Sequence, residues 1–149
     1  MRASTGGFAW RRRPAKLAAL DATLDAYLGG RAEWEIPALR QLLERPDSLE
    51  RRARSLAQNL EAVVPRALQV EVVEDHSYAG GGSLPGFELP TWVVAVRAPT
   101  GAARFAERLR CATPPVLARI RDDLVVFDVR TLLDGDEKAL EQALRGALR

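Results

Sequence analysis

The chain has 149 residues, of which 47% are hydrophobic and 28% are charged. This length fits one domain with a helical extension, and the composition is too apolar for an intrinsically disordered chain. The formal net charge of +2 is a mild bias and does not by itself indicate a nucleic-acid-binding surface. A single cysteine, Cys111, excludes an intrachain disulfide and favours a reducing compartment. With no apolar run long enough to span a membrane and no secretory signal, we expect a cytoplasmic protein with no membrane partner.

The first part of the chain is expected to be helical. Residues 1–16 lack periodicity and predict a poorly anchored lead-in, followed by a helical linker over residues 17–64. Four leucines spaced by three or four residues predict one stripe of an amphipathic helix that ends at the glycines after it: Leu17, Leu20, Leu24 and Leu28. A short second helix is expected over residues 36–43.

A third helix is expected to begin after Pro46 and to end before Pro65. Asp47 or Ser48 is the predicted N-cap. Apolar residues recur at helical spacing along it and predict one buried face: Leu49, Ala53, Leu56, Leu60, Val63 and Val64.

From residue 65 to residue 149 the periodicity alternates between extended and helical. Strands are expected over 67–74 and 91–98, a helix over 102–110, a hairpin of strands 116–120 and 124–129, and a last helix over 137–148 capped by Asp134 or Asp136. The hairpin turns at Arg121–Asp123. The order β-β-α-β-β-α predicts an α+β domain with an antiparallel sheet and helices on one face.

A search for catalytic groups among these residues is mostly negative. His76 follows Asp75, but neighbours on a strand point to opposite faces, so an exposed histidine at a strand end is expected. Cys111 is expected to be a small buried hydrophobe, and its distance from the single histidine argues against a zinc site. Lys16 and Lys138 are expected to be solvated, unlike a lysine that holds pyridoxal phosphate (PLP).

Two segments are candidates for phosphate binding. The loop Gly80, Gly81, Gly82 and Ser83 could bring backbone amides close to an anion, although a flexible connector has the same composition. Arg11 opens a run of three arginines that could contact phosphate or simply be solvated.

Two further arginines, Arg119 and Arg130, are placed by the prediction in the hairpin strands. A charge there must be paired or face solvent, and Asp128 could pair with an arginine of the neighbouring strand.

Several segments, read in order, resemble bacterial selenocysteine synthase, an L-seryl-tRNA(Sec) selenium transferase. The quoted matches run collinearly from about residue 17 to the C-terminus: LAALDATL (17–24), IPALRQLL (36–43), GGGSLPG (80–86), LPTWVVA (89–95), PPVLARI (114–120) and FDVRTL (127–132). The resemblance implies the small C-terminal domain of a fold-type-I PLP enzyme and the helix that leads into it.

What the resemblance implies extends to chemistry and partners. That family converts seryl-tRNA(Sec) to selenocysteinyl-tRNA(Sec) with PLP and selenophosphate, and it forms homo-oligomers that bind tRNA. Its cofactor lysine lies in a large domain that precedes the matched region, so these residues alone are expected to hold no catalytic or cofactor residue and to be inactive. An arginine-bearing segment before the exit helix aligns its second arginine with Arg11. Arg11, Gly80–Ser83 and Arg119 are therefore the predicted substrate- or phosphate-binding residues, with no metal.

Two hypotheses stay open. The chain is either the C-terminal part of a selenium transferase, acting with a PLP-domain chain, or a non-catalytic module that binds tRNA or the full-length enzyme.

Overall fold

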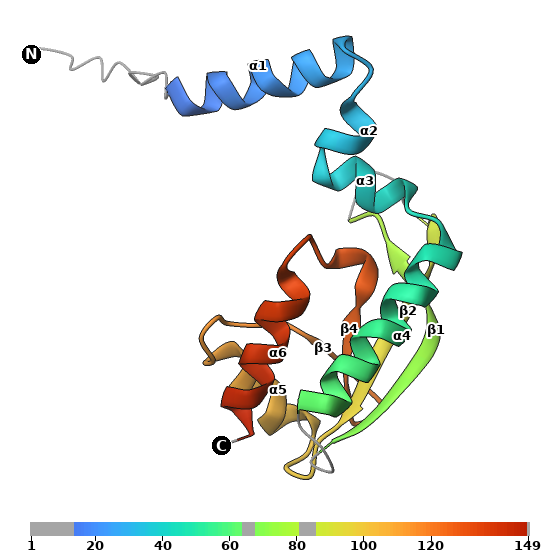
Figure 1. The fold of residues 1–149 in the computed structure, drawn as a ribbon, viewed down its shortest axis with the longest axis vertical. Helices are drawn as coiled ribbons and strands as arrows, with labels where there is room; N and C mark the ends of the chain where they lie inside the picture. Colours follow the sequence, from blue (N-terminus) through green and yellow to red (C-terminus); the bar gives the residue numbers. More distant parts are fainter. Residues whose placement is uncertain (1–13, 64–67, 81–85, 149) are drawn as a thin grey trace, which may run out of the picture. The chain divides into compact units, whose positions relative to one another are not determined.

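Figure 1 shows the computed structural model, which describes residues 14–63, 68–80 and 86–148. By contacts between Cα atoms the chain divides into two units, Met1–Arg40 and Gln41–Arg149. Within the described residues, no helix is long and apolar enough to cross a membrane.

The first unit contains α1 (Pro14–Leu28), α2 (Ala32–Glu35) and the start of α3 (Pro37–Leu43). α1 ends at the predicted glycines, where Gly29 N donates to Asp25 O and Gly30 takes a φ of +66°. α1 begins three residues before the predicted start, since Pro14 fits the first turn of a helix. The predicted amphipathic stripe is exposed, and the rest of the helix is largely alanine.

The second unit opens with α4 (Pro46–Val63), whose predicted apolar face is buried from Leu49 to Leu60. Val64 lies outside the described residues. The predicted N-cap is wrong, because the helix already begins at Pro46, whose fixed φ suits the first helical position. Ser48 instead donates to a carboxylate oxygen of Glu44. α4 lies within the predicted helical linker, residues 17–64, and it packs on strands β1 and β2 of the sheet.

A four-stranded antiparallel sheet has the order β1-β2-β4-β3. β1 (Gln69–Tyr78) and β2 (Glu88–Arg97) pair along their whole length, with Tyr78 opposite Glu88. Each reaches farther toward the loop that connects them than predicted, while β1 begins two residues later and β2 ends one residue earlier than predicted. β3 (Arg119–Arg121) and β4 (Leu124–Asp128) form the predicted hairpin. Its two-residue turn, Asp122–Asp123, has positive φ at both residues, which matches the right-handed twist of the strands.

Three helices pack on one face of this sheet, as predicted: α4, α5 (Ala102–Arg110) and α6 (Asp136–Ala147). Figure 1 shows α4 along β1 and β2, with α5 and α6 beside it. The core between them combines Val94, Val96, Val125 and Phe127 of the strands with Phe105, Leu109, Leu140 and Leu144 of the helices.

The predicted cap of α6 is wrong. Gly135, with a φ of +94°, holds the N-cap position and makes no side-chain cap bond, a conformation that glycine adopts without strain. The Asp136 carboxylate instead accepts from Leu133 N at 2.8 Å, and Asp136 belongs to the helix. Its negative charge in the first turn still favours the helix dipole.

Candidate functional site

The face of the sheet opposite the three helices carries alternate residues of all four strands. Val93, Ala95 and Val126 form a small cluster there, and they are 0%, 2% and 3% exposed. No described helix residue belongs to this cluster. Because a sheet face without helices normally leaves its side chains open to water, something else must cover these three residues.

Val73 of β1 and Leu124 of β4 pack against this cluster, and two arginines of the edge strand β3 bridge the same face of the sheet. Arg119 Nη2 lies 3.1 Å from Asp75 Oδ2, and Arg121 Nη1 lies 2.7 Å from Asp75 Oδ1, although Asp75 is on the opposite edge strand. Neighbouring strands are spaced by about 4.8 Å, so the two side chains must extend across β4 and β2 to reach it. Both arginine side chains stay about half exposed, at 52% and 46%, whereas the side chain of Asp75 is only 12% exposed.

Asp75 is held as a carboxylate by these contacts. Burial acts to raise its pKa, but the hydrogen bond from His76 N, the hydrogen bond and charge of Arg121, and the charge of Arg119 together outweigh it. The pKa of Asp75 therefore lies below its usual value. The charged form of Asp75 is thus the one that closes this face of the sheet.

Asp128, at the end of β4, is a second acidic group on the same face and is almost fully buried. Oδ1 accepts from Thr91 Oγ1 at 2.8 Å and from Arg130 N at 3.0 Å, while Oδ2 accepts from Ser77 Oγ. Arg119 Nη2 lies 3.7 Å from Oδ2, which confirms the predicted pairing of Asp128 with an arginine of the neighbouring strand. Both carboxylate oxygens are therefore satisfied, so the group is poorly placed to act as a general base.

A hollow of about 320 Å³ lies over this part of the sheet. Its lining includes Asp128, Val126 and Ser77, together with Tyr78, Arg119 and the exposed Leu117. The Tyr78 hydroxyl donates to Glu88, whose hydrogen bond and charge raise the pKa of Tyr78. The hollow is thus lined both by the Asp128 carboxylate, whose two oxygens already accept hydrogen bonds, and by apolar side chains.

The predicted position of Arg130 is wrong. It lies in the short 3-10 helix η1 (Val129–Thr131) and not in a hairpin strand, and it is only 4% exposed. Its guanidinium donates to the carbonyl oxygens of Gln41 (2.6 Å), Glu44 (3.2 Å) and Pro90 (2.7 Å). Burial lowers the pKa of Arg130, while the charges of Asp128 and Glu44 oppose that shift.

The carbonyls that Arg130 binds belong to the end of α3, the turn before α4 and the start of β2. A carbonyl at a helix C-terminus has no partner within the helix and carries partial negative charge, which a buried cation compensates. Nε of Arg130 has no partner among the described residues. Arg130 therefore fixes the corner between α3 and α4 to the sheet.

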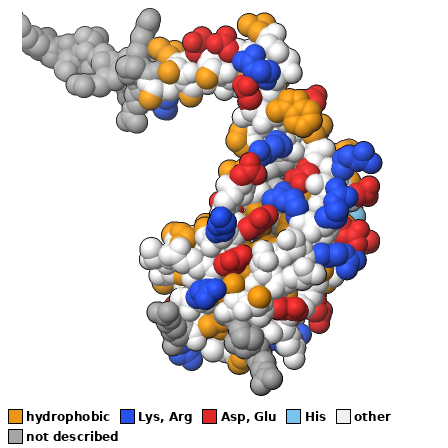
Figure 2. Space-filling view, viewed as in Figure 1, with side chains coloured by type: hydrophobic (Ala, Val, Ile, Leu, Met, Phe, Trp, Pro, Cys, Tyr) orange, Lys and Arg blue, Asp and Glu red, His pale blue; other side chains and the backbone are white. Residues whose placement is uncertain are grey.

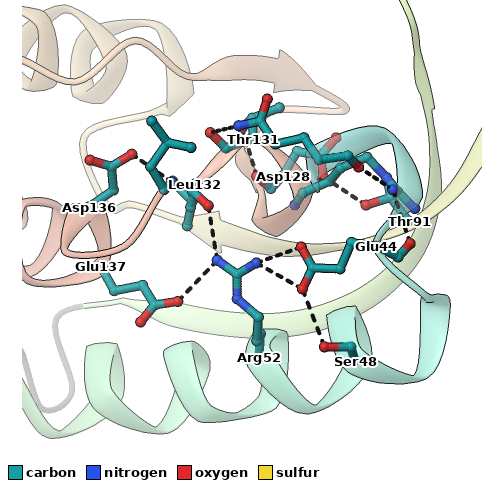
Figure 3. Close-up of polar contacts among 12 residues, drawn as sticks. Glu44, Ser48, Arg52, Thr91, Asp128, Thr131, Leu132, Asp136 and Glu137 are labelled. Atoms are coloured by element: carbon teal, nitrogen blue, oxygen red, sulfur yellow. Dashed lines mark hydrogen bonds and ion pairs between the residues drawn. The ribbon is translucent and has the colours of Figure 1, made fainter. Parts of the chain in front are cut away.

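A second arginine reinforces the same corner, as Figure 3 shows. Arg52 of α4 binds both carboxylate oxygens of Glu44, at 3.0 and 2.9 Å, and also contacts Leu132 O and Glu137 of α6. Nη1 makes both contacts with Glu44, while Nη2 donates to Leu132 O and to Glu137, so the planar guanidinium is held from two sides. This ion-pair network joins α4, η1 and α6 at the end of the domain.

The charge balance on the uncovered face argues against an electrostatic phosphate site there. Two guanidinium groups, Arg119 and Arg121, face two carboxylates, Asp75 and Asp128. Figure 2 presents the other, helix-covered face of the Gln41–Arg149 unit, where arginine and acidic side chains are likewise interspersed and neither sign gathers into a large patch. An anion that bound Arg119 would have to displace carboxylates that already neutralise it.

Of the other predicted site residues, the structure describes only Gly80. Arg11, Gly81, Gly82 and Ser83 lie outside the described residues. Gly80 is described, with a φ of +63° and its N donating to Tyr78 O, at the end of β1. Phosphate binding by these residues and by Arg119 stays a prediction.

Three expectations about reactive groups can be compared with the structure. His76 is exposed as predicted, but it lies inside β1 opposite Pro90 and not at the strand end. Cys111 is exposed, so the prediction of a buried cysteine is wrong: it follows the last turn of α5, beyond the buried stripe that ends at Leu109. Lys16 and Lys138 are both exposed.

The signals for the bridging arginines were present in the sequence but incomplete. Arg119 was predicted in a hairpin strand but Arg121 in the turn, and their partner Asp75 is more than forty positions away in the chain. The strand order, which places β1 and β3 at the two edges of one sheet, is needed to predict that these arginines and Asp75 interact. Among the described residues, no group of three or more His, Cys, Asp or Glu side chains could hold a metal ion.

By its fold, the second unit is an α+β domain with a four-stranded antiparallel sheet covered by helices on one side. The family model described as L-seryl-tRNA selenium transferase matches residues 9–133. The chain is 47% identical over 138 residues to an L-seryl-tRNA(Sec) selenium transferase of Moorella thermoacetica, and 37% identical over 133 residues to that of Aquifex aeolicus. The chain belongs to the L-seryl-tRNA selenium transferase family.

These matches cover most of this chain but only a small part of each relative. Each covers 89% of this chain but only 29% of the relative, and the Nitratidesulfovibrio vulgaris relative, 42% identical over 134 residues, gives the same proportions. The chain therefore spans less than a third of the length of these relatives.

Proposed function

We propose that these residues form the small C-terminal part of a PLP-dependent selenium transferase that converts seryl-tRNA(Sec) to selenocysteinyl-tRNA(Sec) with selenophosphate. The observation that carries the proposal is the match of 47% identity over 138 residues to a relative of that name. The residues that the family model matches, 9–133, include Arg130, Asp128 and the two arginines of β3.

The described residues do not fit PLP as a covalent cofactor. A lysine that binds PLP covalently needs a desolvated site that lowers its pKa, whereas both lysines of the chain are exposed on helices. We therefore derive no step through PLP from these residues. We propose that they contribute one side of the substrate site. That side is the sheet face without helices, which ion pairs hold in place and which carries the hollow beside Arg119.

A chimera tests this proposal directly. The segment of the Moorella thermoacetica relative that matches this chain would be replaced by the corresponding residues of this chain, and conversion of seryl-tRNA(Sec) would be measured with PLP and selenophosphate. We expect the chimera to be active and a matched deletion of that segment to be inactive. A chimera that folds and binds PLP but does not convert seryl-tRNA(Sec) would contradict the proposal.

A second measurement concerns the 149 residues by themselves. With added PLP we expect no absorbance band that depends on Lys16 or Lys138, and no selenium transfer. A band that K16A or K138A abolishes would contradict our assignment of both lysines as surface residues. Salt-sensitive tRNA binding by the same sample would instead favour the non-catalytic tRNA-binding module.

A further inference from the structure

The helix α5 begins without a cap from its own residues. Gly101 holds the N-cap position with a φ of +81° and makes no side-chain cap bond, and the first turn contains no acidic residue. A helix start of this kind leaves amide groups in need of an acceptor and favours a nearby negative charge. The amide of Ala102 nevertheless has an acceptor, because it donates to Oδ1 of Asp123 at 3.2 Å. A residue outside the helix therefore caps α5.

Asp123 belongs to the turn between β3 and β4, 21 positions beyond Ala102 in the chain. Both turn residues have a positive φ, +50° at Asp122 and +58° at Asp123. A two-residue turn of this kind favours glycine at its second position, whereas a helix N-terminus favours a carboxylate. The other oxygen of Asp123, Oδ2, lies 3.9 Å from Nη1 of Arg97 at the end of β2. The aspartate at position 123 thus suits its contacts with α5 and β2 better than it suits the turn.

The position of this hairpin matters for the face of the sheet without helices. β3 carries Arg119 and Arg121, and all three of its residues are exposed, so it has little apolar packing of its own. In the described sheet it pairs with β4, at three positions. Its two arginines nevertheless meet Asp75 on the opposite edge strand, which requires the hairpin to keep one orientation. The contact between Asp123 and α5 holds the turn end of that hairpin.

We propose that Asp123 is a positioning residue, which caps α5 from the hairpin turn and thereby holds β3 where its arginines reach Asp75. The cap itself is independent of the proposed function. Its importance for the substrate site rests on the proposed function, which takes this face of the sheet as one side of that site.

Three variants separate the cap from the turn. D123G removes the carboxylate but suits a positive φ, so the turn itself can still form. D123N keeps a side-chain oxygen that can accept from Ala102 N. D122G is the matched control, because it makes the same change at the neighbouring turn residue, which is exposed and is not the residue that contacts α5.

Hydrogen exchange of the full 149-residue chain tests the cap. D123G should speed exchange of the Ala102 amide by about two- to thirtyfold, the range that follows from losing an N-cap. The amide of Phe105, which donates to Gly101 O in the first turn of α5, should follow it. D123N and D122G should leave both amides close to the unchanged protein. Unaltered exchange in D123G, or equal acceleration in D122G, would overturn the cap.

The titration of Asp75, followed by the NMR signal of its carboxyl carbon, tests whether the cap positions β3. Burial acts to raise the pKa of Asp75, while the hydrogen bond from His76 N and the two arginines of β3 lower it. D123G should shift this pKa upward, because arginines on a displaced strand lower it less. A loss of stability alone would not move the pKa of the folded protein. A titration that D123G leaves unchanged would overturn the positioning role, even if the Ala102 amide exchanged faster.

The chimera with the Moorella thermoacetica relative connects the cap to catalysis. In an active chimera, D123G should lower kcat/KM for seryl-tRNA(Sec), while D122G leaves it unchanged. Equal activity of D123G and the unsubstituted chimera would overturn the link to the substrate site. An inactive unsubstituted chimera would instead contradict the proposed function, and the exchange and titration measurements on the 149-residue chain would still decide the positioning role.

Discussion

The helix-covered face of the sheet and the uncovered face bury their valines almost equally, but they do so by different means. Val94 and Val96 on the first face pack with residues of α4, α5 and α6. Val93 and Ala95 on the second face pack with Val73 and Leu124 instead, on a face that Arg119 and Arg121 bridge to Asp75. Apolar burial by helices depends little on pH or salt, whereas an ionic cover depends on both. The comparison teaches that one sheet can be closed by two mechanisms with different sensitivities.

The largest effect is expected on the helix-covered face. F105A removes a side chain that is 0% exposed at the centre of the core and should lower the free energy of unfolding by about 3–5 kcal/mol. Urea unfolding should give the same loss at low and high salt, because no charge is involved. A loss under about 1 kcal/mol would show that the core can close over the cavity.

A somewhat smaller effect is expected at the Arg130 clamp. R130M keeps most of the side-chain volume but removes the donors to Gln41 O, Glu44 O and Pro90 O, and should cost about 2–4 kcal/mol. R145M, on the exposed side of α6, is the control and should stay within about 0.5 kcal/mol of the unchanged protein. Equal losses in the two variants would contradict a structural role for the clamp.

The ionic cover should give the smallest loss and the clearest pH dependence. D75N should cost about 1 kcal/mol at neutral pH, since the arginines are half exposed and the ion pairs are partly screened. The pKa of Asp75 is lower in the folded protein, so its contribution is complete above the unfolded pKa and disappears as the pH falls through the folded pKa. D75N should therefore flatten the acid side of the stability curve.

The control for that measurement is E74Q, which changes a neighbouring exposed carboxylate without a described ion pair. Its stability should follow the pH dependence of the unchanged protein. If D75N and E74Q gave the same curve, or if high salt left the D75N effect unaltered, the arginines would not be the ionic cover that we describe.

Local patterns predicted much of this fold. The leucine spacing of α4, the hairpin around Asp122–Asp123 and the order of strands and helices all follow from short-range periodicity and turn chemistry. The same kind of spacing in α1 predicted a helix but not what covers it, because periodicity says nothing about the partner. The N-cap predictions failed where proline or glycine took the first position.

The candidate site was much less predictable. Arg130 was predicted as a strand residue that is either paired or facing solvent, because its actual acceptors are backbone carbonyls, which residue identity does not reveal. The bridge from β3 to Asp75 needs the two edge strands placed at opposite sides of one sheet, which no local pattern specifies. Cys111 followed a buried stripe by two residues and was therefore assigned to the wrong side of α5.

The two-residue turn at Asp122–Asp123 limits which insertions and deletions the hairpin of β3 and β4 can accept. It sets which residues of β3 lie opposite β4, with Arg119 facing Val126 and Arg121 facing Leu124. Side chains alternate along a strand, so a single inserted residue that shifted the pairing by one would turn both arginines toward the helices and Ile120, which is now 50% exposed, toward the opposite face of the sheet. Length changes in this hairpin should therefore be tolerated in steps of two, a rule that sequencing of a random insertion library could read directly.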